Sequence, residues 1–139
     1  MQELLPKQFW IANVVEARDL RRVHDLGVAA ICDLAIEEPP IALTRDLIYC
    51  RIPILDGGEN SSATLRLAVA TVVRLLRDES PTLLFCSAGM SRSPAVAAIA
   101  LAMVHAREPD EVLGELAERM PLQVSPHLWR DLQAVHAAW

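Results

Sequence analysis

The chain has 139 residues, which is the length of a single domain, and 53% of them are apolar against 22% charged. A chain this apolar can bury a core, so its composition excludes a disordered protein. With 13 basic and 18 acidic residues the net charge is -5, which argues against nucleic acid as a partner. The longest uninterrupted apolar run, residues 94–104, is too short to cross a membrane, and the first residues lack the pattern of a secretory signal.

The three cysteines, Cys32, Cys50 and Cys86, are an odd number and have no Cys-x-x-Cys spacing. This favours free thiols in a reducing cytoplasm over a disulfide framework or a zinc site. The four histidines show no metal-ligand spacing with the cysteines either. We therefore expect a cytoplasmic protein with no metal and no cofactor.

The first half of the chain alternates between strand and helix patterns. In chain order we expect a strand at 9–11, a helix at 15–26, a strand at 28–34, a loop at 37–40 and a strand at 47–52 that stops at Pro53. Apolar residues every third position predict the helix, and Gly27 suits its left-handed end. The continuous apolar run at 28–34 is typical of a strand covered on both faces.

The second half begins with the strongest loop signal of the chain, Asp56 to Ser62. After it we expect a helix capped by Ser61 or Ser62, and then a buried strand at 82–86. A tight loop at 87–91 should lead into a nearly all-apolar helix at about 92–107. Two more helices should follow, one opened by Pro109 and Asp110 and a last one with Pro126 in its first turn. Strands alternating with helices predict one α/β domain over residues 1–139. It should have a central, mainly parallel sheet of four or five strands and helices on both faces.

The segment Cys86-Ser87-Ala88-Gly89-Met90-Ser91-Arg92-Ser93 lies between the buried strand and the buried helix. A cysteine at a strand end is most often a small hydrophobic residue, and a Cys-to-Arg spacing of six is weak evidence alone. Requiring also a central glycine and a serine after the arginine lowers the chance of coincidence to about one in a thousand.

A loop from strand end to helix start directs successive backbone N–H groups, and the positive end of the helix dipole, into one concavity. Such a concavity favours a tetrahedral oxyanion at residues 87–91 and the thiolate form of Cys86, which would be the nucleophile. Gly89 allows a backbone angle closed to other residues, and Arg92 can donate two N–H bonds to two phosphate oxygens. The Ser93 hydroxyl can donate to the Cys86 sulfur and ease its later departure.

These residues resemble the signature of the cysteine-dependent protein phosphatases, which is Cys, five residues, Arg and then Ser or Thr. The match is to the compact dual-specificity branch, and it extends to the segments 9–13, 26–28, 52–56 and 86–94. The resemblance implies a phosphocysteine enzyme with Cys86 as nucleophile, Arg92 as phosphate ligand and an acid on a separate loop. Asp56 occupies the matching acid position, and Glu59 and Asp46 are weaker substitutes.

Asp56 would protonate the leaving oxygen and then activate water against the phosphocysteine. Its alternative interpretation is a turn residue, because Asp-Gly is a common turn pair. The chain departs from the family at Phe85, where a histidine usually precedes the nucleophile. It departs again at residues 124–127, where a Pro-Asn pair usually braces the phosphate loop. His127 either replaces that asparagine or lies on the surface.

The neutral side chains of Ser87, Ala88 and Met90, together with the net charge, favour a phosphorylated protein or peptide over a more highly charged substrate. We expect no membrane partner. Two other functions stay open: a phosphate-binding module with weak catalysis, favoured by Phe85, and a rhodanese-like sulfurtransferase, which also uses a cysteine in a strand-to-helix loop. Cys32 or Cys50 could trap an oxidised Cys86 as a disulfide.

Overall fold

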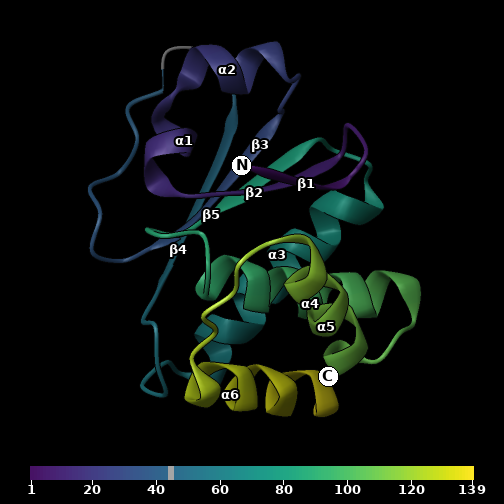
Figure 1. Ribbon diagram of the computed structural model, residues 1–139. Coiled ribbons are helices and arrows are strands. Elements are labelled where there is room, and N and C mark those ends of the chain that lie inside the picture. The colour runs from purple at the N-terminus through teal and green to yellow at the C-terminus, as the bar shows by residue number, and fades with distance from the viewer. Residues whose placement is uncertain (44–45) are drawn as a thin grey trace.

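The computed structural model describes residues 1–43 and 46–139, which form one α/β domain (Figure 1). Its elements in chain order are β1 (Gln2–Leu5), β2 (Phe9–Ala12), α1 (Val14–Arg18), α2 (Leu20–Asp25), β3 (Ala30–Ala35), β4 (Ile48–Ile54), α3 (Ser62–Arg77), β5 (Thr82–Phe85), α4 (Arg92–His105), α5 (Pro109–Arg119) and α6 (Pro126–Ala137). The predicted fold class is confirmed.

The five strands form one sheet in the order β1-β2-β5-β3-β4. All neighbouring pairs are parallel except β1 with β2. Because β5 is the middle strand, its last residue, Phe85, pairs with Ala12 at the end of β2 and with Asp33 in β3. The loop that follows β5 therefore starts at the centre of the carboxyl edge, where open α/β sheets bind their ligands.

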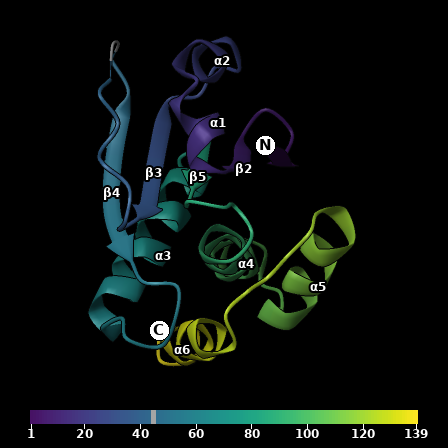
Figure 2. The same ribbon diagram turned by 60° about the vertical axis from the view of Figure 1, so that its left-hand side comes forward.

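Helices cover both faces of the sheet, because side chains alternate between faces along each strand. On one face, α1 and α2 pack with Trp10, Ile31 and Leu83. On the other, α3 to α6 pack with Phe9, Leu34 and Leu84. Figure 2 shows α4 lying among α3, α5 and α6, and its residues from Arg92 to Ala102 are all buried. This burial explains why its sequence is apolar all round.

The helix predicted at residues 15–26 is wrong as one element, because two short helices, α1 and α2, occupy that stretch. Asp19 separates them with a ψ of 76°, outside the helical range, and its side chain accepts a hydrogen bond from the Arg22 N–H. An aspartate side chain that caps a new helix competes with continuation of the old one. The apolar spacing survives the break, since Ala17 and Val23 are both buried in the same cluster.

The structure also differs from the expected strands in one strand end and in one additional strand. The strand predicted to stop at Pro53 continues to Ile54, which is possible because β4 is an edge strand and needs no N–H donor on its open side. Strand β1 was not expected from the sequence, and it pairs only with β2, through Gln2, Glu3 and Leu5.

Within residues 1–43 and 46–139, no helix is both long enough and apolar enough to span a membrane.

Candidate phosphate-binding site

The loop of residues 87–91 is fixed to its surroundings by backbone contacts on two sides. The Val14 N–H donates to the Ser87 carbonyl at 3.1 Å, and the Gln123 N–H donates to the Met90 carbonyl at 2.8 Å. Gly89 has a φ of +72°, and a Cβ there would lie 3.1 Å from backbone atoms of Ala12 and Asn13. Only glycine satisfies both the backbone angle and the close approach.

Cys86 lies at the base of this loop and is 1% exposed. Its sulfur accepts a hydrogen bond from the Ser93 N–H at 3.5 Å. The Ser93 hydroxyl, the donor predicted from the sequence, is buried and has no partner among the described residues. The first turn of α4 thus contacts the sulfur through its main chain.

The Arg92 side chain is buried and held in place through one edge of its guanidinium group. Nη1 donates to the Ile54 carbonyl at 3.0 Å and to Glu37 Oε2 at 2.9 Å, and Nη2 donates to Glu37 Oε1. Nε is also buried but has no partner in the described part of the chain. A buried donor without a partner is costly unless a ligand supplies the acceptor. Nε is therefore a donor available to an oxyanion.

Glu37, which the sequence predicts only as part of a loop, contacts both Arg92 and Ser87. Its carboxylate binds both Nη atoms of Arg92 and accepts a hydrogen bond from the Ser87 hydroxyl. The hydrogen bonds from Arg92 are the main reason why the pKa of Glu37 falls to about 2. Burial is the largest single influence on the pKa of Arg92 and lowers it, but the hydrogen bond to Glu37 and the attraction of nearby acidic groups together outweigh burial, so the pKa is raised. The sequence signal that could have identified Glu37 is its position, because it follows β3, the strand next to β5, and ligands bind at that edge of a sheet.

A buried polar cluster anchors the segment that carries Glu37. Arg51 Nη2 donates to the carbonyls of Ala35 and Glu38, on either side of Glu37, at 3.3 and 2.8 Å. The fully buried Asp33 lies 3.8 Å from Arg51 Nη1 and accepts a hydrogen bond from the Tyr49 hydroxyl. Glu37 therefore approaches Arg92 from a fixed backbone.

Asp56 lies just beyond β4 and contacts the loop through a side chain. The Ser91 hydroxyl donates to Asp56 Oδ1 at 2.5 Å. The two substitutes considered from the sequence, Glu59 and Asp46, make no hydrogen bond to residues 86–93 in the described structure. Of the three acids, the structure brings Asp56 to the loop.

Phe85 and His127, which stand where dual-specificity phosphatases usually have other residues, lie in different surroundings. Phe85 is buried on the sheet face covered by α1 and α2. His127 is exposed and lies against the acid loop, since a Cβ on Gly58 would be 3.1 Å from His127 Cβ. Main-chain N–H groups of Gln123 and Ser125 brace the loop of residues 87–91 instead.

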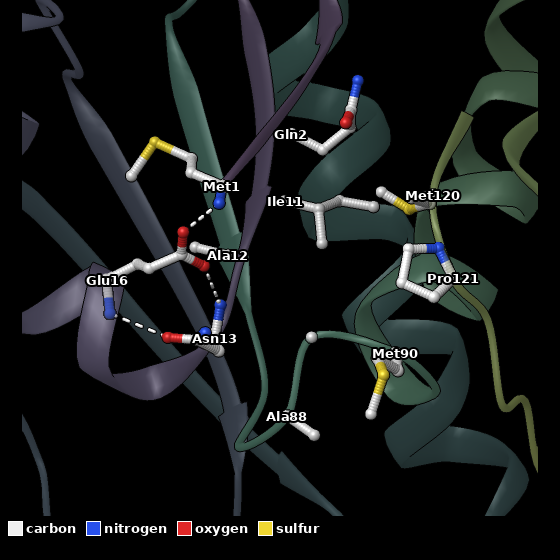
Figure 3. A pocket seen from close by; sticks show the side chains of 11 residues that line it. Met1, Gln2, Ile11, Ala12, Asn13, Glu16, Ala88, Met90, Met120 and Pro121 are labelled. Carbon is white, nitrogen blue, oxygen red and sulfur yellow. Dashed lines mark hydrogen bonds and ion pairs between the residues drawn. The ribbon is translucent and has the colours of Figure 1, made fainter.

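A cavity of about 250 Å³ adjoins the outside of the same loop (Figure 3). Ala88, Gly89 and Met90 line it from the loop, and Met120 and Pro121 line it from the segment after α5. Cys86 and Arg92 do not line it. The cavity therefore lies beside the loop and is not the place where Cys86 and Arg92 would meet a ligand.

The other two thiols lie side by side on neighbouring strands, because Cys32 pairs with Cys50 in the register of β3 and β4. All three cysteines are free. Burial raises the pKa of Cys32 to about 12, with a smaller contribution from Cys50. A thiol in this state is a poor nucleophile at neutral pH.

Comparison with solved structures identifies the fold. Human DUSP28 superposes with a TM-score of 0.82 at 19% identity, over 96% of this chain and 94% of its own. DUSP15 superposes with a TM-score of 0.84 at 21% identity, over 99% and 88%. The human tyrosine phosphatase-like serine/threonine/tyrosine-interacting protein gives 0.84 at 19%, over 99% and 96%.

The chain has the dual-specificity phosphatase fold. No protein-family model and no curated protein sequence matches it. At such low identities the similarity concerns the dual-specificity phosphatase fold alone, and one fold can carry different functions. The residues of the site, rather than the fold, decide the activity.

Proposed function

We propose that the protein is a cysteine-dependent phosphatase, of the protein-tyrosine or dual-specificity type, that hydrolyses phosphomonoesters on proteins. The observation that carries this proposal is the buried Arg92 side chain, whose Nε–H lacks an acceptor among the described residues. A phosphoryl oxygen would supply that acceptor. Glu37 holds the rest of the guanidinium group still, so the donor is in place before a ligand arrives.

In the first chemical step, the Cys86 thiolate attacks phosphorus and the bond to the leaving oxygen breaks. Arg92 and the amides of residues 87–91 bind the three non-bridging oxygens, and Asp56 gives its proton to the leaving oxygen. In the second step, Asp56 takes a proton from water, which attacks the phosphocysteine and releases inorganic phosphate and the thiolate. The Ser93 N–H, 3.5 Å from the sulfur, stabilises the departing sulfur anion.

The substrate class follows from charge. The loop side chains of Ser87, Ala88 and Met90 are neutral, and the chain has a net charge of -5. Phosphoinositides and other polyanions would meet few cations, whereas a single phosphorylated side chain needs only Arg92 and the loop amides. A phosphorylated protein or peptide is therefore the substrate we propose.

The test is a steady-state assay of the purified chain with an aryl phosphate and with phosphopeptides. We expect turnover that vanadate inhibits and a chelator leaves unchanged. Cys86→Ser should abolish it, and Asp56→Asn should lower kcat more than it raises KM. Turnover that survives in Cys86→Ser would refute the phosphocysteine route.

A second candidate, a phosphate-binding module with little catalysis, is favoured by Phe85 in place of the usual histidine. It predicts that a phosphopeptide binds and stays intact through prolonged incubation. Rapid mixing with an aryl phosphate separates the two functions, because only the enzyme releases a burst of phenol equal to the amount of Cys86.

A further inference from the structure

The Ser91 side chain joins the acid loop to the segment before α6. Its hydroxyl donates to Asp56 Oδ1 at 2.5 Å, and its oxygen accepts the Ser125 N–H at 3.1 Å. Ser91 itself is 7% exposed. Three segments far apart in sequence therefore meet at one hydroxyl group.

The Ser91 oxygen accepts one of these two hydrogen bonds, and the Ser91 hydroxyl donates the other. A main-chain N–H can only donate, so the Ser91 oxygen must accept from Ser125. The single hydroxyl hydrogen of Ser91 is directed to Asp56, and Oδ1 accepts it. An oxygen that accepts this bond is a poor place for a proton, which leaves Oδ2 as the oxygen that carries it.

Ser91 precedes α4 at the position where a serine normally caps a helix, yet its side chain makes no capping hydrogen bond. Its φ and ψ of -128° and -77° differ from the extended values that the caps Ser61 and Ser125 adopt. The hydroxyl is thus directed away from the helix end and toward the acid.

We propose that Ser91 is a positioning residue for Asp56. Its hydroxyl binds Oδ1 and so orients the carboxyl group with Oδ2 as the proton-donating oxygen. The Ser125 N–H binds the Ser91 oxygen and keeps the hydroxyl directed at Asp56. This inference rests on the proposed function and adds to it a residue that acts only through the acid. Ser91 itself exchanges no proton with the substrate.

The experiment uses two leaving groups. A leaving phenol of low basicity departs without a proton, whereas one of ordinary basicity needs the acid. For Ser91→Ala we expect kcat/KM to fall about tenfold with phenyl phosphate and no more than about twofold with p-nitrophenyl phosphate, with KM nearly unchanged. In an Asp56→Asn background, Ser91→Ala should cost no more than about twofold with either substrate.

A second pair of variants tests the hydrogen bond between Ser125 and Ser91. Ser125 has a φ of -60°, which proline can adopt, so Ser125→Pro removes the N–H bond to Ser91. Ser125→Ala is its matched control, because it loses only the side-chain cap of α6. Relative to that control, Ser125→Pro should reproduce the selective loss with phenyl phosphate.

Three results would overturn the inference. They are an equal loss of both substrates in Ser91→Ala, a further large loss when it is added to Asp56→Asn, or a Ser125→Pro variant that behaves like Ser125→Ala. Failure of the proposed function gives a different result, since the unmodified protein would then hydrolyse neither phosphate ester.

Discussion

Glu37 and Arg92 form an ion pair at the centre of the candidate site, and its stability depends on pH. The pKa of Glu37 is about 2, below its usual value of 4.5, mainly because Arg92 donates to the carboxylate. A depressed pKa stabilises the fold above pH 4.5, and this contribution is lost as the pH falls toward 2. We therefore expect Glu37→Gln to lower the Tm at pH 7 and to leave it nearly unchanged at pH 2, as measured by thermal melts across that range.

Glu115→Gln is the control for this prediction, because Glu115 pairs with Arg107 on the open surface. Solvent screens such a pair, so its loss should change the Tm much less at any pH. A Glu37→Gln protein whose Tm deficit stays constant from pH 7 to pH 2 would show that the charge of Glu37 does not contribute to stability.

Gly89 and Gly114 form a matched pair of positions for alanine substitution. Gly89→Ala would force a positive φ on alanine and press its Cβ against the backbone of Ala12 and Asn13. We expect a loss of stability of about 1–3 kcal/mol together with loss of turnover. Gly114 lies in α5 with open space around it, and Gly114→Ala should stabilise by about 0.5–1 kcal/mol. Urea unfolding and the aryl phosphate assay would measure both, and a neutral Gly89→Ala would contradict the argument.

Single site residues could be predicted from the sequence where they lie close together along the chain. Cys86, Arg92 and Ser93 sit in one short segment, so a spacing pattern could single them out, and the structure places them together. Glu37 and Ser125 reach the site only because β3 lies beside β5 and because the α5–α6 segment returns to the loop. Contacts of that kind depend on tertiary structure, which local patterns do not carry.

Among the elements, α4 contributes most to the core, since its residues from Arg92 to Ala102 are buried on all sides. Ile99→Ala should cost about 2–5 kcal/mol, because the neighbours of Ile99 in α4 and the packed helices cannot collapse into the space. Val15→Ala, in the short helix α1, should change stability by less than about 0.5 kcal/mol, since Val15 is 76% exposed. Chemical denaturation of both variants checks this, and similar costs would contradict it.

The elements that could be predicted are those with a strong pattern of their own. The apolar runs of β3 and β5 and the apolar stripe of α3, which is capped by Ser61, can each be recognised within a short stretch of sequence. Strand β1 is short and half-exposed and depends on pairing with β2. The break at Asp19 depends on a side chain that competes for backbone hydrogen bonds. Neither feature leaves a periodic signal.

For the whole molecule, charge should govern the choice of substrate. Two carboxylates, Glu37 and Asp56, contact the loop directly, and the net charge is -5. We expect kcat/KM to be larger for phosphopeptides with basic residues around the phosphate than for acidic ones. This ratio should shrink as ionic strength rises from about 0.01 M to 1 M, because the screening length falls from about 30 Å to about 3 Å. Kinetics with a matched peptide pair at several salt concentrations measure it, and a preference for the acidic peptide would contradict it.

The anchored arginine has a thermodynamic consequence for ligand capture. An arginine side chain free in water has about 2 kcal/mol of rotamer entropy to lose, and here folding has already removed most of it through Glu37 and the Ile54 carbonyl. An incoming oxyanion meets an immobile receptor and is spared that cost. Calorimetry with vanadate should therefore show a less favourable binding entropy once Glu37→Gln sets the guanidinium free to reorient.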